Sequence, residues 1–462
     1  MKQILARVRF KWYFRKSRYA EALASLERFP CTGDELWACY SLGMYSVVAN
    51  NSWDGRHLKG GFAFCVSLAA AGRFEEAENA VKTLEKLRGF DRYRFRFAAA
   101  IVQYMPSLAL RIADAPNPPP QLLAGLLIKA GELEKAAQVI ADAPMEGETY
   151  LLKSNIFALS PQEQLNALNG FLASYDLSKV SLIDAAKNVS VTNIKCTANT
   201  AVSTKNLPLV SILVTTCNTS SYIKHSLSSL LSQSYKNLEI IVADDYSTDD
   251  TVSEIAKIAS KDSRVKFFAN SVNVGTYAAK TLALRYAEGE FVVCHDSDDF
   301  AHPEWIERQV KPLLENSKFV ASISQWIKIN DEGRYWARNA YPLSRLNRTS
   351  LMFRKNIVLE KMGSWDIVRT GADSEFHARL KLVFGKKAVK YLRAPFIIGA
   401  YREDSLTTSL SYGYDSPVRQ AYWEAWMRWH IDCLKDGKTP MMNIDKRPFP
   451  APEEIITTIN CC

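Results

Sequence analysis

The second half of the chain alternates apolar segments with amphipathic ones, and this alternation is the feature that most constrains the fold. Apolar runs typical of buried strands begin at Leu209, Leu238, Val265 and Phe291, and helical patterns lie between them. Strands that alternate with helices form a mostly parallel sheet covered by helices. We therefore predict an α/β domain over residues 208–410.

Polar residues follow three of these strands. The first strand runs into Thr215–Asn218, the second ends in Asp244 and Asp245, and the fourth ends in His295–Asp299. In parallel α/β sheets, ligands bind beyond the carboxyl ends of the strands. The sequence therefore predicts a single ligand site at this edge of the sheet.

Three carboxylates, those of Asp296, Asp298 and Asp299, lie within one short segment. Such carboxylates repel one another unless a cation lies between them, and hard divalent cations prefer carboxylate and phosphate oxygens. We therefore expect Mn²⁺ or Mg²⁺ to bind here and to bridge a diphosphate. A solvated acidic turn is the alternative interpretation, and the nearby His295 belongs to no set of histidines with metal-ligand spacing.

Four segments of this half resemble the family 2 glycosyltransferases, which have the glycosyltransferase A fold. In chain order they read VSILVTTCN, IVADDYSTDDT, NVGTYAAK and EFVVCHDSDDFAHPEW. The resemblance implies that Thr215 and Asp245 hold the uracil end of a UDP-sugar and that Asp244 assists. It also implies that Asp296 contacts the ribose or the metal and that Asp298 binds the metal, and it leaves Asp299 as an alternate ligand.

Two positions depart from the pattern of the family. Cys217 stands where many relatives carry an aromatic residue that stacks on the base, and Lys280-Thr281 stands where relatives often have Arg-Asn. Strong stacking on the base is therefore not expected. Lys280 is a candidate cation near the diphosphate or the sugar.

An inverting transfer needs a carboxylate that takes a proton from the acceptor hydroxyl. The segment GSWDIVRTGADSEFHARL resembles the acceptor-side motif of the family, with Ala372 in place of the usual Glu. The resemblance makes Asp373 the candidate base and Glu375 a helper, with Trp365 and Asp366 shaping the acceptor pocket. Capping of a helix by Asp373 is the alternative role, and the two roles are compatible.

The segment YREDSLT contains a further candidate. It resembles the segment of the family that closes over the diphosphate, which makes Arg402 the predicted electrostatic partner of the leaving group. An exposed arginine in a purely structural ion pair would have the same local sequence, so this alternative stays open.

Residues 1–185 show helical rather than strand patterns. Similar phrases begin at Ser17, Gly72 and Gly131, and repeats of this size are typical of stacked helix pairs. The pattern resembles degenerate tetratricopeptide repeats. It predicts either a helical packing domain without a ligand or a groove for other polysaccharide-assembly proteins, and a polar linker over 186–207 would follow it.

Residues 411–462 are expected to form a C-terminal helix and tail that pack on the catalytic domain. Within them, Tyr422, Trp426, Trp429 and Cys433 share one helical stripe. Aromatic residues at this spacing are more often part of a core than of a ligand site.

The net charge of +9 is concentrated at the beginning of the chain. Seven cations precede the first acid, Glu21, which leaves the remainder at only +2 (9 − 7). This distribution argues against a nucleic-acid surface. Apolar residues such as Leu5, Val8 and Trp12 interleave with the cations, which predicts either a helix on an anionic membrane surface or the first helix of the helical domain, with Trp12 and Phe14 buried.

Cysteine usage and hydropathy indicate the compartment. The nine cysteines include no CxxC pair, which argues against a zinc site and favours free thiols in a reducing cytosol. No apolar run approaches the roughly 20 residues that a membrane span needs, and no secretory signal is visible. We therefore expect a cytoplasmic protein, peripheral on the inner face of the membrane.

These observations together predict an inverting, metal-dependent glycosyltransferase that uses a UDP-sugar and acts on a surface polysaccharide or a lipid-linked glycan. The phrases HDSDDFAHP and GADSEF further resemble bacterial capsule enzymes, including heparosan-type synthases, which implies transfer of GlcA or GlcNAc. The alternatives are a non-catalytic scaffold with a degenerate transferase domain and a nucleotidyltransferase. A glycoside hydrolase would also use paired carboxylates, but the UDP-type motifs argue against it.

Overall fold

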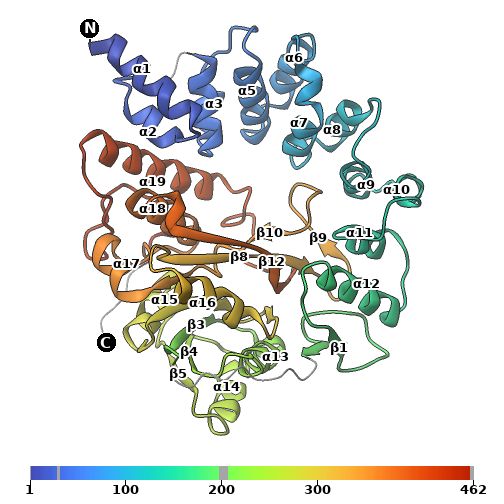
Figure 1. The fold of residues 1–462 in the computed structure, drawn as a ribbon, viewed down its shortest axis with the longest axis vertical. Helices are drawn as coiled ribbons and strands as arrows, with labels where there is room; N and C mark the ends of the chain where they lie inside the picture. The colour runs from blue at the N-terminus through green and yellow to red at the C-terminus, as the bar shows by residue number, and fades with distance from the viewer. Residues whose placement is uncertain (1, 29–31, 197–206, 458–462) are drawn as a thin grey trace.

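The computed structural model describes residues 2–28, 32–196 and 207–457. An all-α region comes first and an α/β region follows (Figure 1). This order confirms the predicted fold class. Part of the predicted linker (197–206) and the two final cysteines, Cys461 and Cys462, lie outside the described residues.

The N-terminal region is a succession of short helices in which neighbours pack against each other, for example α5 on α6, α7 on α8, α9 on α10 and α11 on α12. The helices are α1 (Lys2–Arg15), α2 (Tyr19–Ala24), α3 (Gly33–Ser41), α4 (Tyr45–Ala49), α5 (Leu58–Ala70), α6 (Phe74–Leu84), α7 (Arg94–Ile101), α8 (Pro106–Ala113), α9 (Pro120–Lys129), α10 (Leu133–Ile140), α11 (Thr149–Ile156) and α12 (Pro161–Ala173). A hairpin of β1 (Val180–Leu182) and β2 (Ile194–Cys196) follows them.

The recurring phrases of the sequence coincide with recurring turns. Gly72 and Gly131 have φ angles of 75° and 80°, and each lies just before a helix. Glycine has no Cβ, so it adopts this left-handed conformation without strain. Ala77 and Ala136, in the helices that follow, are completely buried where adjacent helices meet. A small side chain at these positions allows the close approach on which the stacking depends.

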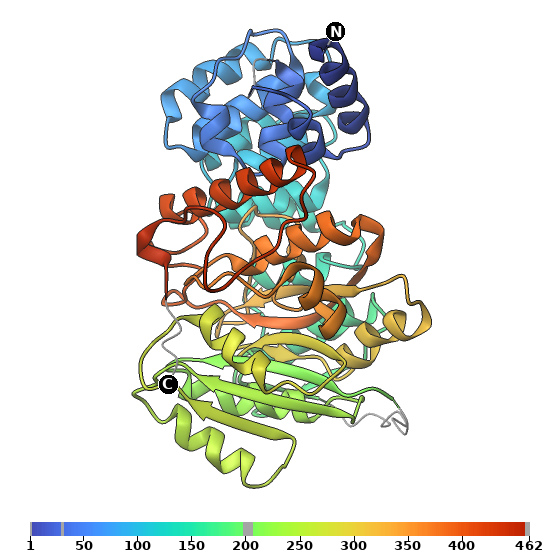
Figure 2. The ribbon, with the colours of Figure 1, turned by 90° about the vertical axis from the view of Figure 1, so that its left-hand side faces the viewer.

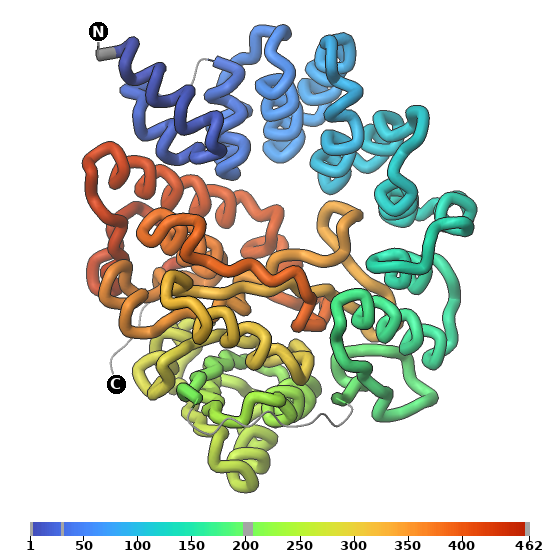
Figure 3. The backbone as a smooth tube through the Cα atoms, in the orientation of Figure 1, coloured from blue at the N-terminus to red at the C-terminus, as the bar shows by residue number. Residues whose placement is uncertain are grey.

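The helices form an arc over the α/β region and touch it at both ends (Figures 1, 2 and 3). At one end the indole of Trp423 donates to the carbonyl of Leu42 at 2.7 Å. At the other end the side-chain amide of Asn155 exchanges two hydrogen bonds with the backbone of Tyr335, both 2.6 Å long. Contacts at both ends fix the arc relative to the α/β region.

The α/β region is built on a ten-stranded sheet, whose main strand order is β5-β4-β3-β6-β11-β8-β12-β7. Its strands are β3 (Val210–Thr216), β4 (Leu238–Asp244), β5 (Val265–Ala269), β6 (Phe291–Asp296), β7 (Phe300–Ala301), β8 (Ala321–Ile329), β9 (Tyr335–Trp336), β10 (Arg345–Leu346), β11 (Met352–Arg354) and β12 (Val389–Ala400). Its helices are α13 (Ser220–Leu231), α14 (Thr251–Ala259), α15 (Thr276–Arg285), α16 (Trp305–Glu315), α17 (Lys355–Met362), α18 (Ala372–Phe384) and α19 (Pro417–Lys435).

The four strands that the alternation predicted, β3 to β6, pair in parallel as expected. Thr215 lies opposite Asp296 on β6, and Thr216 lies opposite Asp244 on β4. The second half of the sheet is mixed, because β11 runs antiparallel between β6 and β8. Helix α15 packs on β3 and β4, and α16 packs on β8 and β12.

Helix α19 lies between the helical arc and the α/β region and contacts both α2 and α18 (Figure 1). The aromatic stripe identified in the sequence faces this interior, because Tyr422, Trp426 and Trp429 are all buried. A buried ion pair on α18 is linked to α19 by a hydrogen bond. The carboxylate of Glu375 accepts from Arg379 at 2.7 and 2.8 Å and lies 2.9 Å from Nε2 of His430.

Helix α1 exposes most of its apolar side chains. Ile4, Leu5, Val8 and Trp12 are 70%, 54%, 60% and 49% exposed. Phe10 is buried instead, and the ring of Phe14 stacks on it with centroids 5.6 Å apart. If α1 were an ordinary repeat helix, Trp12 and Phe14 would both be buried. Only Phe14 packs inward. Throughout the described part of the chain, each helix is too short or too polar to span a membrane.

Replacing Glu375 with Ala should destabilise the fold. Glu375 and Arg379 are fully buried. Burial raises the pKa of Glu375, but the charge of Arg379 and the hydrogen bonds from His430 and Arg379 outweigh this effect and lower it. The variant would leave the Arg379 guanidinium without its counter-charge, at a cost of about 3–5 kcal/mol in the free energy of unfolding. Urea unfolding followed by circular dichroism measures this. The exposed Glu360→Ala on α17 is the control, and equal midpoints for the two variants would contradict the assignment.

Candidate active site

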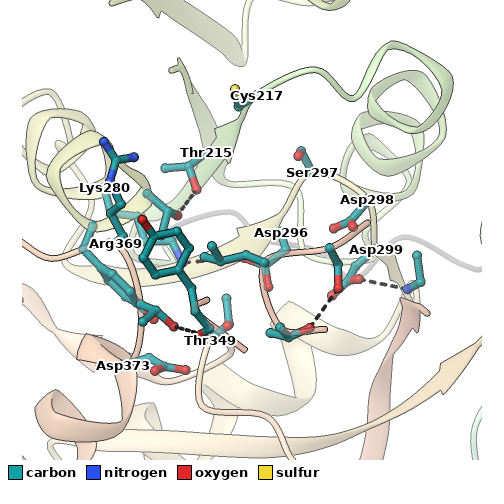
Figure 4. Close-up of a pocket in the computed structure, with 18 of the residues that line it drawn as sticks. Thr215, Cys217, Lys280, Asp296, Ser297, Asp298, Asp299, Thr349, Arg369 and Asp373 are labelled. Carbon is teal, nitrogen blue, oxygen red and sulfur yellow. Dashed lines mark hydrogen bonds and ion pairs between the residues drawn. The ribbon is translucent and has the colours of Figure 1, made fainter. Parts of the chain in front are cut away.

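A cavity of about 410 Å³ opens at the carboxyl ends of β3, β4 and β6, at the predicted edge of the sheet. Its lining combines residues from three parts of the sequence. Figure 4 shows Thr215 and Cys217 at its upper side, Asp298 and Asp299 to the right, and Asp373 at the lower left. We call these three parts the nucleotide end (Thr215 and Cys217), the acid cluster (Asp296, Asp298 and Asp299) and the acceptor end (Asp373), after the roles that the sequence resemblance implies.

At the nucleotide end, the hydroxyls of Thr215 and Thr276 lie 2.8 Å apart. The carboxylate of Asp245 accepts hydrogen bonds from the backbone N–H groups of Val274 and Gly275, both at 2.8 Å. These bonds connect the end of β4 to the start of α15. Asp245 is therefore held rigidly at the wall of the cavity.

Asp244 has a different position from its neighbour. It does not line the cavity, is 1% exposed, and accepts hydrogen bonds from the backbone N–H and the hydroxyl of Ser247 at 3.0 and 2.5 Å. These bonds shape the turn after β4. The structure therefore gives Asp244 a supporting position behind the cavity wall.

Cys217 lies exposed at the mouth of the nucleotide end, and the side-chain amide of Asn273 donates to its Sγ at 3.6 Å. Burial of part of the thiol and the nearby Asp245 carboxylate raise the pKa of Cys217, which keeps the thiol neutral at neutral pH. The guanidinium of Arg369 donates to the other side of Asn273 at 2.8 Å. Asn273 and Arg369 lie within the quoted segments NVGTYAAK and GSWDIVRTGADSEFHARL, but the sequence assigned neither of them a role.

In the acid cluster, each carboxylate has a distinct environment. Asp296 lies 3.5 Å from Nζ of Lys280, and Asp298 lies 3.2 Å from Nε of Arg402. Asp299 is 5% exposed and accepts from the backbone N–H of Ala400 at 3.1 Å. The predicted Lys280 and Arg402 therefore both lie beside the acids.

The cluster carries unfavourable negative charge. Burial, followed by repulsion from Asp298 and Asp296, raises the pKa of Asp299 well above its ordinary value. Burial also raises the pKa of Asp298, although Arg402 offsets part of this effect. His295 adds no positive charge, because burial lowers its pKa to about 4. An additional cation would therefore stabilise the cluster.

Divalent cations fit this donor set when a second molecule supplies ligands. In the described residues, no three His, Cys, Asp or Glu side chains are grouped closely enough to hold a metal alone. Mg²⁺ and similar ions commonly take one or two carboxylates from the protein and the remaining oxygens from phosphates and water. Asp298 and Asp296, with Asp299 behind them, meet this requirement.

At the acceptor end, Asp373 lies in the first turn of α18 and lines the cavity. The residue that precedes the helix is Gly371, with φ at 86°, so Asp373 does not cap the helix as the alternative interpretation proposed. Burial, and then the nearby Asp373 carboxylate, raise the pKa of Tyr277 well above its ordinary value. Tyr277 and Asp373 also border a small inner cavity beside the main one.

The structure does not bring all the predicted acceptor residues to the main cavity. Trp365 borders only the small inner cavity. Asp366 is buried, where it binds the hydroxyl of Tyr422 at 3.1 Å and the guanidinium of Arg447 at 2.8 Å. Glu375 points into the core, toward Arg379 and His430. These three residues support the acceptor end from behind.

Sequence reasoning also missed cavity residues that come from segments without a recognisable motif. They are Trp326 and Lys328 on β8, Arg348 and Thr349 before β11, and Tyr412, Tyr414 and Arg419 around the start of α19. Each of them lies more than 20 positions from the acid cluster, and only the folded sheet brings them to it. An excess of arginine over acid around Arg348 was the one available signal in the sequence.

The family model described as Glycosyl transferase family 2 matches residues 211–371. An uncharacterized glycosyltransferase of Haemophilus influenzae is 38% identical over 125 residues, which are 27% of this chain and 38% of the relative. The UDP-Glc:alpha-D-GlcNAc-diphosphoundecaprenol beta-1,3-glucosyltransferase WfgD of Escherichia coli is 38% identical over 109 residues, 24% of this chain and 42% of that enzyme. The chain thus spans less than half the length of these relatives.

Among solved structures, residues 1–349 of Staphylococcus aureus TarS in complex with UDP-GlcNAc are 20% identical, with a TM-score of 0.39. The alignment covers 48% of this chain and 66% of that one. The family match falls on the segment that carries β3 to β6, the acid cluster and the loop before Asp373. Residues 211–371 therefore match a glycosyltransferase family 2 domain, as the motifs indicated.

Proposed function

We propose that this chain is an inverting glycosyltransferase that moves a sugar from a UDP-sugar to a hydroxyl of a glycan acceptor. The observation that carries the proposal is the single cavity, which is lined at one end by Thr215 and Asp245, in its centre by the acid cluster, and at the other end by Asp373. A donor nucleotide, a diphosphate and an acceptor need this order of sites.

The nucleotide end suits a uracil base that is held by hydrogen bonds. Asp245, fixed by two backbone N–H groups, and the hydroxyl of Thr215 offer polar atoms at the wall. Cys217 provides no aromatic face, so hydrogen bonding rather than stacking would select the base. Asn273 and Arg369 lie beside Cys217 and extend this polar wall.

The centre of the cavity suits the diphosphate. Asp298 and Asp296, with Asp299, would hold Mn²⁺ or Mg²⁺, which supplies positive charge to the departing UDP when bound. Lys280 and Arg402 contribute fixed positive charges next to these acids. Both cations would stabilise the leaving group through charge-assisted hydrogen bonds.

The transfer itself needs a base opposite the leaving group. In the proposed reaction, the Asp373 carboxylate takes the proton of the acceptor hydroxyl while that oxygen attacks the anomeric carbon. The bond between the anomeric carbon and the diphosphate oxygen breaks, and UDP leaves with the bonding electron pair. Attack from the face opposite the diphosphate inverts the anomeric centre.

The substrate class follows from resemblance. The phrases shared with capsule enzymes favour UDP-GlcA or UDP-GlcNAc as the donor, whereas the named E. coli relative uses UDP-Glc. That relative acts on a lipid-linked diphosphate sugar, so a lipid-linked or growing surface polysaccharide is the proposed acceptor. The helical arc is a proposed docking region for other polysaccharide-assembly proteins.

Replacing Asp373 with Asn should abolish transfer and spare donor binding. The amide keeps the shape of the side chain and cannot accept the proton, so the rate should fall by about 10²–10⁴. The assay measures UDP release from UDP-GlcA, UDP-GlcNAc and UDP-Glc with Mn²⁺ and glycan acceptors, with donor affinity from calorimetry. The exposed Asp432→Asn on α19 is the matched control.

Three outcomes of this assay would contradict the proposal. Turnover by Asp373→Asn within a few-fold of the unsubstituted protein would exclude Asp373 as the base. Release of pyrophosphate from a nucleoside triphosphate would identify a nucleotidyltransferase, and donor binding without any UDP release would favour a scaffold.

Replacing Asp298 with Ala should remove metal-dependent turnover while the fold survives, and Asp296→Ala should do the same. We expect UDP release in Mn²⁺ to fall at least about a hundredfold, because a carboxylate ligand and its orientation are lost together. The exposed Asp142→Ala serves as the control for loss of one carboxylate. If both site variants kept near-normal turnover in Mn²⁺ and a chelator abolished that turnover, the metal would bind to other residues.

We also propose that α1 binds an anionic membrane surface. Its exposed apolar side chains lie beside the exposed cations Arg7, Arg9 and Arg15, and Nζ of Lys16 lies 3.6 Å above the ring of Trp12. This composition is that of an interfacial helix, and each cation near an anionic surface contributes about 1 kcal/mol. Such binding would place the cavity near a lipid-linked acceptor.

The double variant Leu5→Asp/Val8→Asp should weaken binding to phosphatidylglycerol vesicles about tenfold or more. Each substitution removes an apolar side chain that could enter the interface and adds a repelled charge. Both residues are more than half exposed, so the fold should tolerate the change. The control, Phe74→Asp/Ile183→Asp, introduces the same charges at two other exposed apolar positions. Equal loss in both double variants, or none in the first, would refute a role for α1 in membrane binding.

A further inference from the structure

We propose that Arg348 and Arg419 bind an oxyanion of the acceptor, a phosphate or a carboxylate, next to Asp373. The inference rests on the proposed function and adds to it the chemical class of the acceptor. Both arginines line the cavity at the acceptor end, and neither belongs to a motif recognised in the sequence.

The positive charges of the cavity fall into two groups. Lys280 and Arg402 have carboxylate partners in the acid cluster, at 3.5 and 3.2 Å. Among the described residues, the other four cations of the cavity, Lys328, Arg348, Arg369 and Arg419, form no ion pair with a carboxylate. Lys328 still acts on the charges of Asp298 and Asp299, and Arg369 binds Asn273, which leaves Arg348 and Arg419. A pair of uncompensated guanidinium groups in a partly buried cavity is costly unless an anion binds there.

Arg419 has an unused hydrogen-bond donor. It lies in the first turn of α19, with its guanidinium 4.5 Å from the centroid of the Tyr414 ring. Its Nη1 atom is buried and has no hydrogen-bond partner in the described residues. Burial and Asp373 raise the pKa of Tyr277, and the positive charge of Arg419 lowers it. Arg419 and Asp373 therefore both lie near Tyr277.

Arg348 stands in a cluster of positive groups. It borders both the main cavity and the small inner cavity that Asp373 also lines, and it lies 5.9 Å from the Trp423 ring. On α18, Lys381 lies close behind it, and burial together with the charges of Arg348 and Lys386 lowers the pKa of Lys381 to about 8. The cluster therefore raises the positive potential at the acceptor end.

The donor already has its own cations. Lys280 and Arg402 flank the acid cluster, and Arg369 lies at the nucleotide end, where it binds Asn273. Arg348 borders the small inner cavity together with Asp373 and Lys280, and Arg419 lies near Tyr277, which borders the same cavity. The acceptor is thus the substrate that would meet them.

Guanidinium groups recognise oxyanions through two parallel N–H···O bonds, which suits both phosphate and carboxylate. Two sources of such a group fit a glycan acceptor. One is the diphosphate that joins the first sugar to a lipid carrier, and the other is the carboxylate of an acidic sugar at the end of a growing chain. In either case the anion would anchor the acceptor with a hydroxyl near Asp373.

The test compares three acceptors at saturating donor: octyl N-acetylglucosaminyl diphosphate, a disaccharide ending in glucuronic acid, and a neutral octyl N-acetylglucosaminide. We expect the unsubstituted protein to prefer one of the anionic acceptors over the neutral one in kcat/KM. Arg348→Gln and Arg419→Gln should each reduce that preference about ten- to a hundredfold, as expected for loss of a charge-assisted bond. The anionic acceptor that loses its advantage identifies the source of the oxyanion.

Arg285→Gln, at the exposed end of α15, removes one positive charge away from the cavity and should leave the preference unchanged. An unchanged preference in both cavity variants would overturn the inference. So would an increase in donor KM that is the same with all three acceptors, since it would assign the arginines to the donor.

A second measurement separates the inference from the proposed function. Calorimetry with octyl diphosphate and methyl glucuronide, in saturating UDP to fill the donor end, reports anion binding without turnover. One result would contradict the proposed transfer and support the anion site. In it, no acceptor supports UDP release, but one anion binds and both cavity variants weaken that binding at least tenfold. Absence of binding by both anions to the unsubstituted protein, together with turnover of the neutral acceptor, would reject the anion site alone.

Discussion

The parallel pairing of β3 with β4 and β6 is the constraint on which the site depends. Because these strands run in register, Thr215 lies opposite Asp296, and the ends of β3 and β4 bring Thr216 opposite Asp244. A shift of one residue in this register would turn each of these side chains to the other face of the sheet. The hydrogen bonds from Val274 and Gly275 to Asp245 then attach α15, and with it Lys280, to the same edge.

The acceptor end depends on a different set of contacts. The buried bonds of Glu375 with Arg379 and His430 hold α18 against α19, which places Asp373 and Arg419 on neighbouring helix ends at the cavity. Helix α19 also binds the helical arc through Trp423 and Glu424. The arc therefore contacts a helix of the acceptor end, whereas the nucleotide end is formed by strand ends and by the loops before α15 and α18.

The order of negative and positive charges along the cavity matches its proposed chemistry. Negative charge is concentrated in the acid cluster, where burial and repulsion raise the pKa of Asp298 and Asp299. Positive charge that has no carboxylate partner in the described part of the chain lies at Arg348 and Arg419. A bound cation would stabilise the acid cluster, and a bound anion would stabilise the two arginines. Each excess of charge therefore indicates a ligand of the opposite charge.

The sequence by itself determined the elements and motifs that are local. Hydrophobic periodicity predicted the strands β3 to β6, the helices between them and the all-α character of the first region. Short motifs predicted that Thr215, Asp245, Asp296 and Asp298 lie at strand ends. Tertiary structure alone decided the antiparallel insertion of β11, the burial of Asp366 and Glu375 in the core, and the recruitment of Arg348 and Arg419. Periodicity and spacing describe neighbours along the chain, whereas these features depend on contacts between residues far apart in it, such as His430 with Glu375. For the same reason a carboxylate in a motif could be recognised from the sequence, but only the fold decides whether it faces the cavity or the core.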